Sequence, residues 1–110
     1  MNTQHPQLIA GRWKKIQLCE QLAHVGSEVE RAINWKEKGN IEYSQFAFFR
    51  CLELLDLTIA CDYTYSQLKE LTRLRECLVD YFFGKNSYSS SAGLWRKYFY
   101  AFNYITRLGR

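Results

Sequence analysis

The chain has few of the residues that interrupt or cross-link a fold. Its 110 residues include one proline, six glycines and four cysteines, none of them in a C-x-x-C pair. The low proline and glycine content excludes collagen-like and linker-dominated sequence, and the cysteine spacing matches no zinc or redox motif. We expect the cysteines to be reduced thiols in or beside the core, with a disulfide or metal ligation as the alternatives. They are Cys19, Cys51, Cys61 and Cys77.

Long hydrophobic runs are also missing. No apolar stretch approaches the ~20 residues that a membrane span needs. The N-terminal residues MNTQHPQ do not form the basic and then apolar run of a signal peptide. We therefore expect no membrane segment and a cytoplasmic protein.

What the chain does have is apolar and aromatic content. Hydrophobic residues make up 47% of the sequence and aromatic residues 16%, which argues against disorder and fits one domain over residues 1–110. The apolar residues recur every three or four positions, and no alternation of period two competes, so the fold class is predicted to be all-α. The predicted helices cover about residues 7–38, 41–61, 65–83 and 94–108.

Capping residues support the predicted helix ends. Gly39 and Gly84 suit helix C-termini, and Asn40 suits the N-cap of the second helix. Thr64 and Gln67 form a capping box at the start of the third. The polar residues 84–93 form the one predicted loop of any length.

Short connections between these helices favour antiparallel neighbours. The predicted architecture is an up-down-up-down antiparallel four-helix bundle with a long first helix. At ~1.5 Å per residue that helix is about 48 Å long, against about 30 Å for the middle two. Either it breaks near Gly26, or its N-terminal end overhangs the bundle and exposes apolar side chains such as Trp13 to a partner.

Motifs of catalysis are absent from the sequence. There is no Walker loop, no G-x-S-x-G and no H-E-x-x-H. The best candidate is Glu20, His24 and Glu28, spaced by four along one helix face, but that face lies opposite the apolar stripe and is predicted to be solvated. We therefore predict no enzyme and assign no catalytic residue, metal ligand or cofactor. A cryptic hydrolase or metal site on these three residues is the lesser alternative.

Positive charge is concentrated at the two ends of the chain. The net charge is +4, yet residues 1–15 hold three basic groups and residues 85–110 hold five, with no acid in either segment. The middle of the chain holds seven basic and eleven acidic residues. An up-down bundle would bring the two basic ends together at one pole.

The last helix carries the most specific pattern. One face, the predicted core side, carries Leu94, Trp95, Tyr98, Phe99, Phe102 and Ile105. The other face carries Arg96, Lys97, Tyr100, Asn103, Tyr104 and Arg107. Aromatic and arginine side chains are favoured at protein–protein interfaces, and the same groups bind phosphates and stack on bases. The candidate binding residues are Arg12, Lys14, Lys15, Arg96, Lys97, Tyr100, Tyr104 and Arg107.

Two functions follow from this face. We predict a small, non-enzymatic helical interaction module that self-associates or serves as the small subunit of a larger complex. The alternative is an accessory protein that binds RNA or DNA through the same residues.

Overall fold

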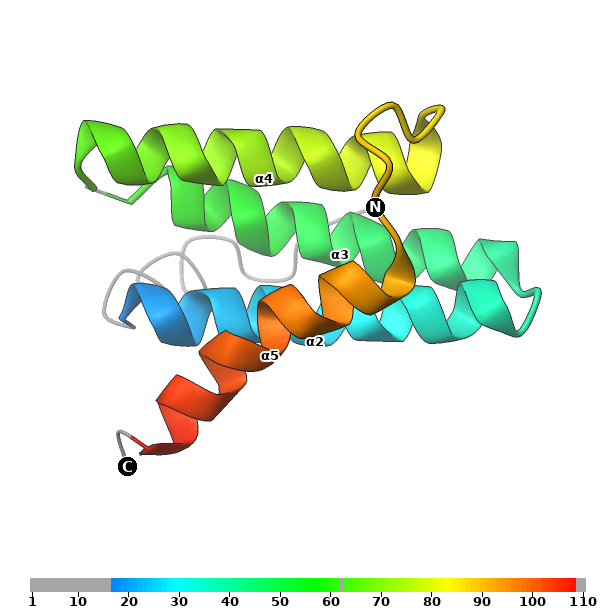
Figure 1. Cartoon of the computed structure of the whole chain (residues 1–110), viewed down its shortest axis with the longest axis horizontal. Coiled ribbons are helices and arrows are strands. Elements are labelled where there is room, and N and C mark those ends of the chain that lie inside the picture. The colour runs from blue at the N-terminus through cyan, green and yellow to red at the C-terminus, as the bar shows by residue number, and fades with distance from the viewer. Residues whose placement is uncertain (1–16, 62, 109–110) are drawn as a thin grey trace.

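The structure is a computed structural model that describes residues 17–61 and 63–108. These residues form four helices and no strand (Figure 1), which confirms the all-helical prediction for this part of the chain. None of the four helices is both long enough and apolar enough to cross a membrane. The helices are α2 (Leu18–Glu37), α3 (Ile41–Ile59), α4 (Tyr65–Phe83) and α5 (Ala92–Leu108).

Local signals in the sequence set several of the helix ends. Gly39 has a φ of 80° in the turn after α2, a conformation that glycine adopts without steric cost. The Asn40 side chain accepts a hydrogen bond from the Tyr43 N–H at 3.1 Å and caps α3. At α4, the Gln67 N–H donates to Thr64 Oγ1 at 3.2 Å and the Thr64 N–H donates to Gln67 Oε1 at 3.0 Å. The predicted N-cap and capping box are both confirmed.

Other boundaries differ from the predictions by a few residues. The predicted start of the first helix, near residue 7, lies outside the described residues. From Leu18 onward α2 continues through Gly26 as one α-helix. The second helix ends at Ile59 rather than near residue 61, and α5 begins at Ala92 rather than near residue 94. This earlier start is set by Ser91, whose Oγ accepts a hydrogen bond from the Leu94 N–H at 3.2 Å.

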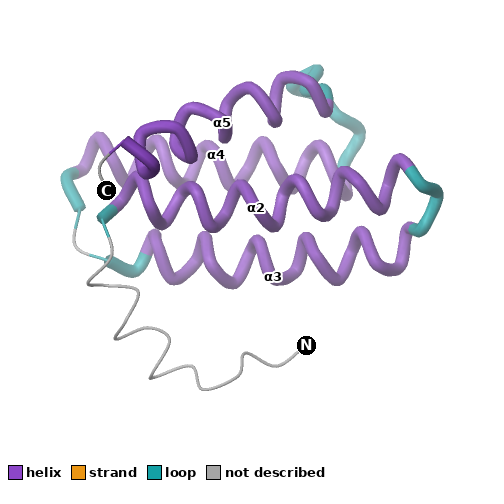
Figure 2. The backbone as a smooth tube through the Cα atoms, turned by 90° about the horizontal axis from the view of Figure 1, so that it is seen from below, coloured by secondary structure: helices purple, strands orange, loops and turns teal. Residues whose placement is uncertain are grey.

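Three of the helices lie side by side, and the fourth crosses them. Helices α2, α3 and α4 run roughly parallel to one another, whereas α5 runs obliquely over α2 on the side opposite α3, with its C-terminal end pointing away from α4 (Figures 1 and 2). Helix α5 contacts mainly α2. These contacts are compatible with a bundle, while the up-down-up-down topology and the long first helix stay predictions.

The core lies between α2, α3 and α4 and extends under the first half of α5. Phe48, Cys51 and Leu55 of α3 are fully buried in it. Burial raises the pKa of the Cys51 thiol, because an apolar surrounding disfavours the thiolate. A buried hydrogen bond of 2.8 Å from Ser44 Oγ to the Ala32 carbonyl joins α3 to α2.

The segment between α4 and α5 is ordered by side-chain hydrogen bonds. The Asp80 carboxylate accepts hydrogen bonds from the Ser87 N–H at 2.9 Å and the Tyr88 N–H at 3.1 Å. The Asn86 side chain bonds both the N–H and the carbonyl of Ser90, each at 2.8 Å. These bonds hold the end of α4 against the turn and fix the point from which α5 starts across α2.

Candidate interaction surface

The inner face of α5 is anchored by two aromatic residues. Trp95 is 8% exposed and Phe99 4%, and their rings stack with centroids 6.2 Å apart. Phe99 packs directly on Gly26 of α2, where an added Cβ would lie 2.6 Å from Phe99 Cβ. The absence of a side chain at Gly26 therefore allows α5 to approach α2 closely. The prediction that the Trp and Phe rings point inward is confirmed at these two positions.

The outer face of α5 presents two tyrosines. Tyr100 is 66% exposed and Tyr104 54%, and their rings stack with centroids 6.4 Å apart and an interplanar angle of 23°. Their spacing of one helical turn makes them neighbours on the surface. Lys97 is exposed on the same helix, three residues before Tyr100. Lys97, Tyr100 and Tyr104 are the predicted site residues that the structure places in solvent, and we call them the α5 face.

A groove of about 430 Å³ runs between α2 and the α5 face. Val29, Trp95 and Phe99 give it an apolar floor, and Ser27 and Asn103 supply hydrogen-bonding groups at its edges. A concave apolar surface with a few polar groups is typical of binding sites. The lining residues are Gly26, Ser27, Val29, Glu30, Trp95, Arg96, Phe99, Tyr100 and Asn103.

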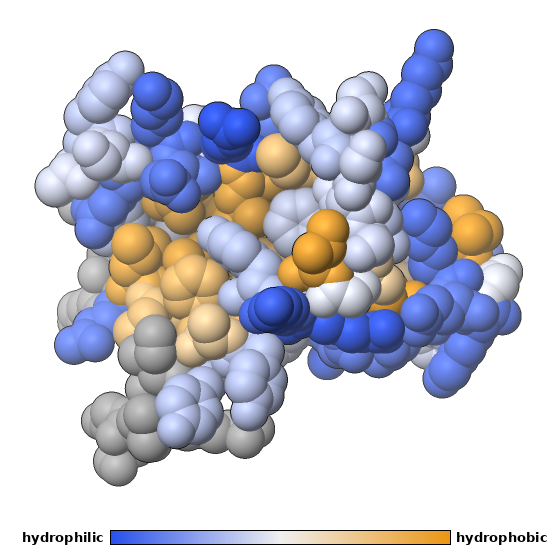
Figure 3. Space-filling view, in the orientation of Figure 1, coloured by the Kyte–Doolittle hydropathy of each residue, from blue (hydrophilic) through white to orange (hydrophobic). Residues whose placement is uncertain are grey.

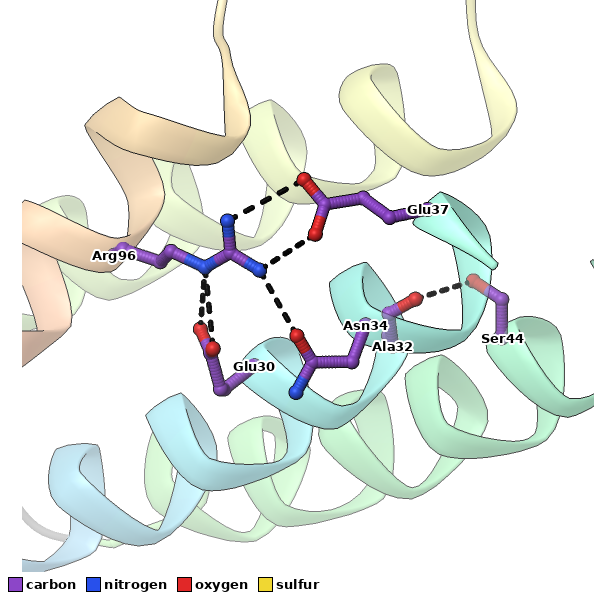
Figure 4. A network of polar contacts seen from close by, with 6 residues as sticks. All are labelled: Glu30, Ala32, Asn34, Glu37, Ser44 and Arg96. Carbon is purple, nitrogen blue, oxygen red and sulfur yellow. Dashed lines mark hydrogen bonds and ion pairs between the residues drawn. The ribbon is translucent and has the colours of Figure 1, made fainter. Parts of the chain in front are cut away.

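The Arg96 side chain points from α5 toward α2 (Figure 4). Its Nε donates to Glu30 Oε2 at 2.9 Å, and its Nη2 donates to Glu37 Oε1 and to Asn34 Oδ1, each at 2.9 Å. Hydrogen bonding to Arg96 lowers the pKa of Glu37 below its ordinary 4.5, and hydrogen bonds to Glu37 and Glu30 raise the pKa of Arg96. Two carboxylates therefore offset the charge of this guanidinium, which fastens α5 to α2.

The basic pole predicted from the sequence falls mostly outside the described residues. Arg12, Lys14 and Lys15 lie outside the described residues. Arg107 belongs to α5, but its side chain is outside the described part of the molecule. Among the predicted basic residues, the structure therefore places Lys97 in solvent and Arg96 in a network with α2.

Sequence reasoning missed the residues that hold α5 in place. The sequence places Gly26 on the apolar stripe of its helix and marks it as a possible break, but it does not connect Gly26 with Phe99, or Asn34 and Glu37 with Arg96. The available signal was that residues 26, 30, 34 and 37 recur every three or four positions along one face of α2. A helix that crosses this face of α2 needs a small residue such as Gly26 where the two helices come closest, and polar residues such as Asn34 and Glu37 beside that point.

Two residues predicted to face the core are more exposed than expected. Leu94 is 59% exposed and Tyr98 40%, because α5 crosses α2 at an angle and makes few contacts with α4. The crossing leaves a groove of about 250 Å³ lined by Tyr98 and Phe102 of α5 and by Leu71 of α4. Figure 3 shows hydrophobic side chains gathered on this side of the molecule between α4 and α5.

The catalytic candidate of α2 forms no metal site among the described residues. His24 is exposed, and Glu28 Oε1 accepts a hydrogen bond from Arg31 at 2.8 Å. Within residues 17–61 and 63–108, no three His, Cys, Asp or Glu side chains are grouped so that they could hold a metal ion.

Comparisons with protein-family models, with curated proteins and with solved structures found no match to this chain. The geometry of α5 and its groove is therefore the basis for the function proposed below.

Proposed function

We propose that this protein is a non-enzymatic helical interaction module that binds a protein partner through the α5 face and the adjoining groove. One observation carries the proposal: two stacked tyrosines stand 66% and 54% exposed, and the first of them, Tyr100, lines the groove over Trp95 and Phe99. Exposed aromatic side chains beside a pocket are the usual anchors of protein interfaces.

The chemistry of the α5 face suits a protein surface. Tyrosine buries a large apolar ring while its hydroxyl keeps a hydrogen bond, and Tyr100 and Tyr104 already hold each other in a stacked arrangement. An apolar side chain of the partner would fill the groove over Trp95 and Phe99. The polar edge at Ser27 and Asn103 would bond the partner's backbone.

The ion pairs of Arg96 favour a protein over a nucleic acid as the partner. Phosphate backbones are bound by uncompensated cations, but Arg96 faces the carboxylates of Glu30 and Glu37. Lys97 is then the remaining cation of α5 whose side chain the structure describes. Nucleic acid stays the alternative, and binding that weakens steeply with salt would favour it.

We propose that the helices carrying this surface form the up-down-up-down bundle predicted from the sequence. We infer that the protein acts in the cytoplasm, either self-associated or as the small subunit of a complex. In a complex, α5 supplies the surface that binds the partner, while Arg96 and Gly26 hold α5 on α2.

Affinity purification of the full chain from its native host, with and without nuclease, tests the proposal. We expect a protein partner in stoichiometric amount that survives nuclease and is lost from the Tyr100→Ser/Tyr104→Ser variant. Tyr65→Ser/Tyr88→Ser is the matched control, because these tyrosines are 82% and 50% exposed on other segments, and it should keep the partner. A partner retained by the Tyr100→Ser/Tyr104→Ser variant, or recovery abolished by nuclease, would overturn the proposal.

A further inference from the structure

A second aromatic surface lies on the outer side of α3, away from the α5 face. Tyr43 is 50% exposed, Phe46 45% and Phe49 38%. The Phe49 ring stacks on that of Phe83 of α4, which is 44% exposed, with centroids 5.7 Å apart. Figure 2 shows α3 and α5 on opposite sides of α2. Exposed apolar patches of this kind mark interaction sites.

The sequence of this surface is symmetric about Phe46. Tyr43 and Phe49 lie three residues before and after it, and Glu42 and Arg50 lie four residues before and after it. Positions three and four apart share one side of a helix, so the aromatic residues form a central stripe with one acid and one base at its ends. Both charged side chains are exposed, and no described residue forms an ion pair with either of them.

We propose that a second copy of this chain binds here, with the two α3 helices antiparallel across a twofold axis beside Phe46. A twofold axis perpendicular to α3 makes the two helices antiparallel, and the contact is self-complementary. Each residue before Phe46 then meets the residue equally far after Phe46 in the other copy. Glu42 meets Arg50 of the second copy, Tyr43 meets Phe49 of the second copy, and each contact occurs twice.

The charges select the antiparallel arrangement. In a parallel pairing Glu42 would face Glu42 of the second copy, and Arg50 would face Arg50, which places like charges together. In the antiparallel pairing both ends of the aromatic stripe are closed by opposite charges. This complementarity on a single helix points to a second copy rather than to an unrelated protein.

The exposed area predicts a weak dimer. At roughly 200 Å² per aromatic ring, the exposed parts of Tyr43, Phe46, Phe49 and Phe83 amount to about 350 Å² on each copy. A standard interface buries about 800 Å² per partner. The charged and polar side chains around the stripe would add the rest, so we expect dissociation in the micromolar range rather than an obligate dimer.

Sedimentation velocity of the full chain between about 1 and 200 µM tests the inference. We expect a concentration-dependent monomer–dimer equilibrium that Phe46→Asp abolishes. Glu42→Arg and Arg50→Glu should each weaken the dimer about tenfold or more, because each places like charges together twice. The combined Glu42→Arg/Arg50→Glu variant should restore the dimer to within about threefold, since it exchanges the charges and keeps their pairing.

Two controls separate this inference from folding effects and from the proposed function. Glu76→Arg reverses an exposed charge on α4 and should leave the dimer unchanged, and the unfolding transition of each variant reports whether it folds. Tyr100→Ser/Tyr104→Ser should also leave the dimer unchanged. A strictly monomeric protein, a dimer that persists in a folded Phe46→Asp variant, or a combined charge exchange that restores nothing would each overturn the inference.

Discussion

Substitution of Gly26 by alanine perturbs the contact on which the position of α5 depends. The new Cβ would lie 2.6 Å from Phe99 Cβ, 2.7 Å from Cγ and 2.8 Å from Cδ1. Carbon atoms pack best at about 3.5–4.0 Å, so α5 must retreat from α2 by about 1 Å. The clash includes Phe99 Cβ, which a change of rotamer cannot move away, so the helices themselves must separate.

Two opposing effects set the size of the change. Alanine is favoured over glycine inside a helix by about 1 kcal/mol, while overpacking a close contact costs typically about 1–3 kcal/mol. The expected net result is a loss of about 1 kcal/mol in the free energy of unfolding. For a domain of this size, that loss lowers Tm by about 4–8 °C.

Gly93 provides the matched control for this experiment. It lies in α5 with nothing nearer to an added Cβ than Ser91 Oγ at 4.0 Å. Gly93→Ala should therefore stabilise the protein by about 0.5–1 kcal/mol through helix propensity, and urea unfolding followed by circular dichroism would measure both variants. If Gly26→Ala proved as stabilising as Gly93→Ala, the close approach of α5 to α2 would be refuted.

Three further predictions concern single residues. Arg96 lowers the pKa of Glu37 in the folded protein, so the ionised Glu37 stabilises the fold at pH values above 4.5, and this stabilisation is lost as the pH falls below 4.5. Glu37→Gln should therefore flatten the dependence of the free energy of unfolding on pH in this range. An unchanged dependence would refute the ion pair. Cys51 is 0% exposed and should resist alkylation in the native protein, whereas the half-buried Cys19 and Cys77 should react. Peptide mapping by mass spectrometry would show which cysteines are modified. Thr64→Ala removes the capping box of α4 and should cost about 0.5–2 kcal/mol in urea unfolding, whereas wild-type stability would contradict that role.

The sequence predicts those parts of the fold that depend on near neighbours. Asn40, Thr64 and Gln67 act within three or four residues of themselves, so their capping roles follow from their order in the chain. The inward direction of Trp95 and Phe99 follows from helical periodicity for the same reason.

The arrangement around α5 depends on contacts that sequence order does not encode. Arg96 reaches Glu30 and Glu37 across 66 and 59 positions, and which face of α2 it meets depends on the angle at which α5 crosses. The same angle explains the exposure of Leu94. An amphipathic pattern identifies the buried side of a helix, but it gives no crossing angle.

The most direct test of the proposed function is photo-crosslinking from position 100 of the full chain in its native host. A photoreactive amino acid at position 100 on the α5 face should form a covalent adduct with one protein, while the same group at position 65 should not. Adducts with nucleic acid, or the same protein adduct from both positions, would contradict the assignment of the α5 face as a protein-binding surface.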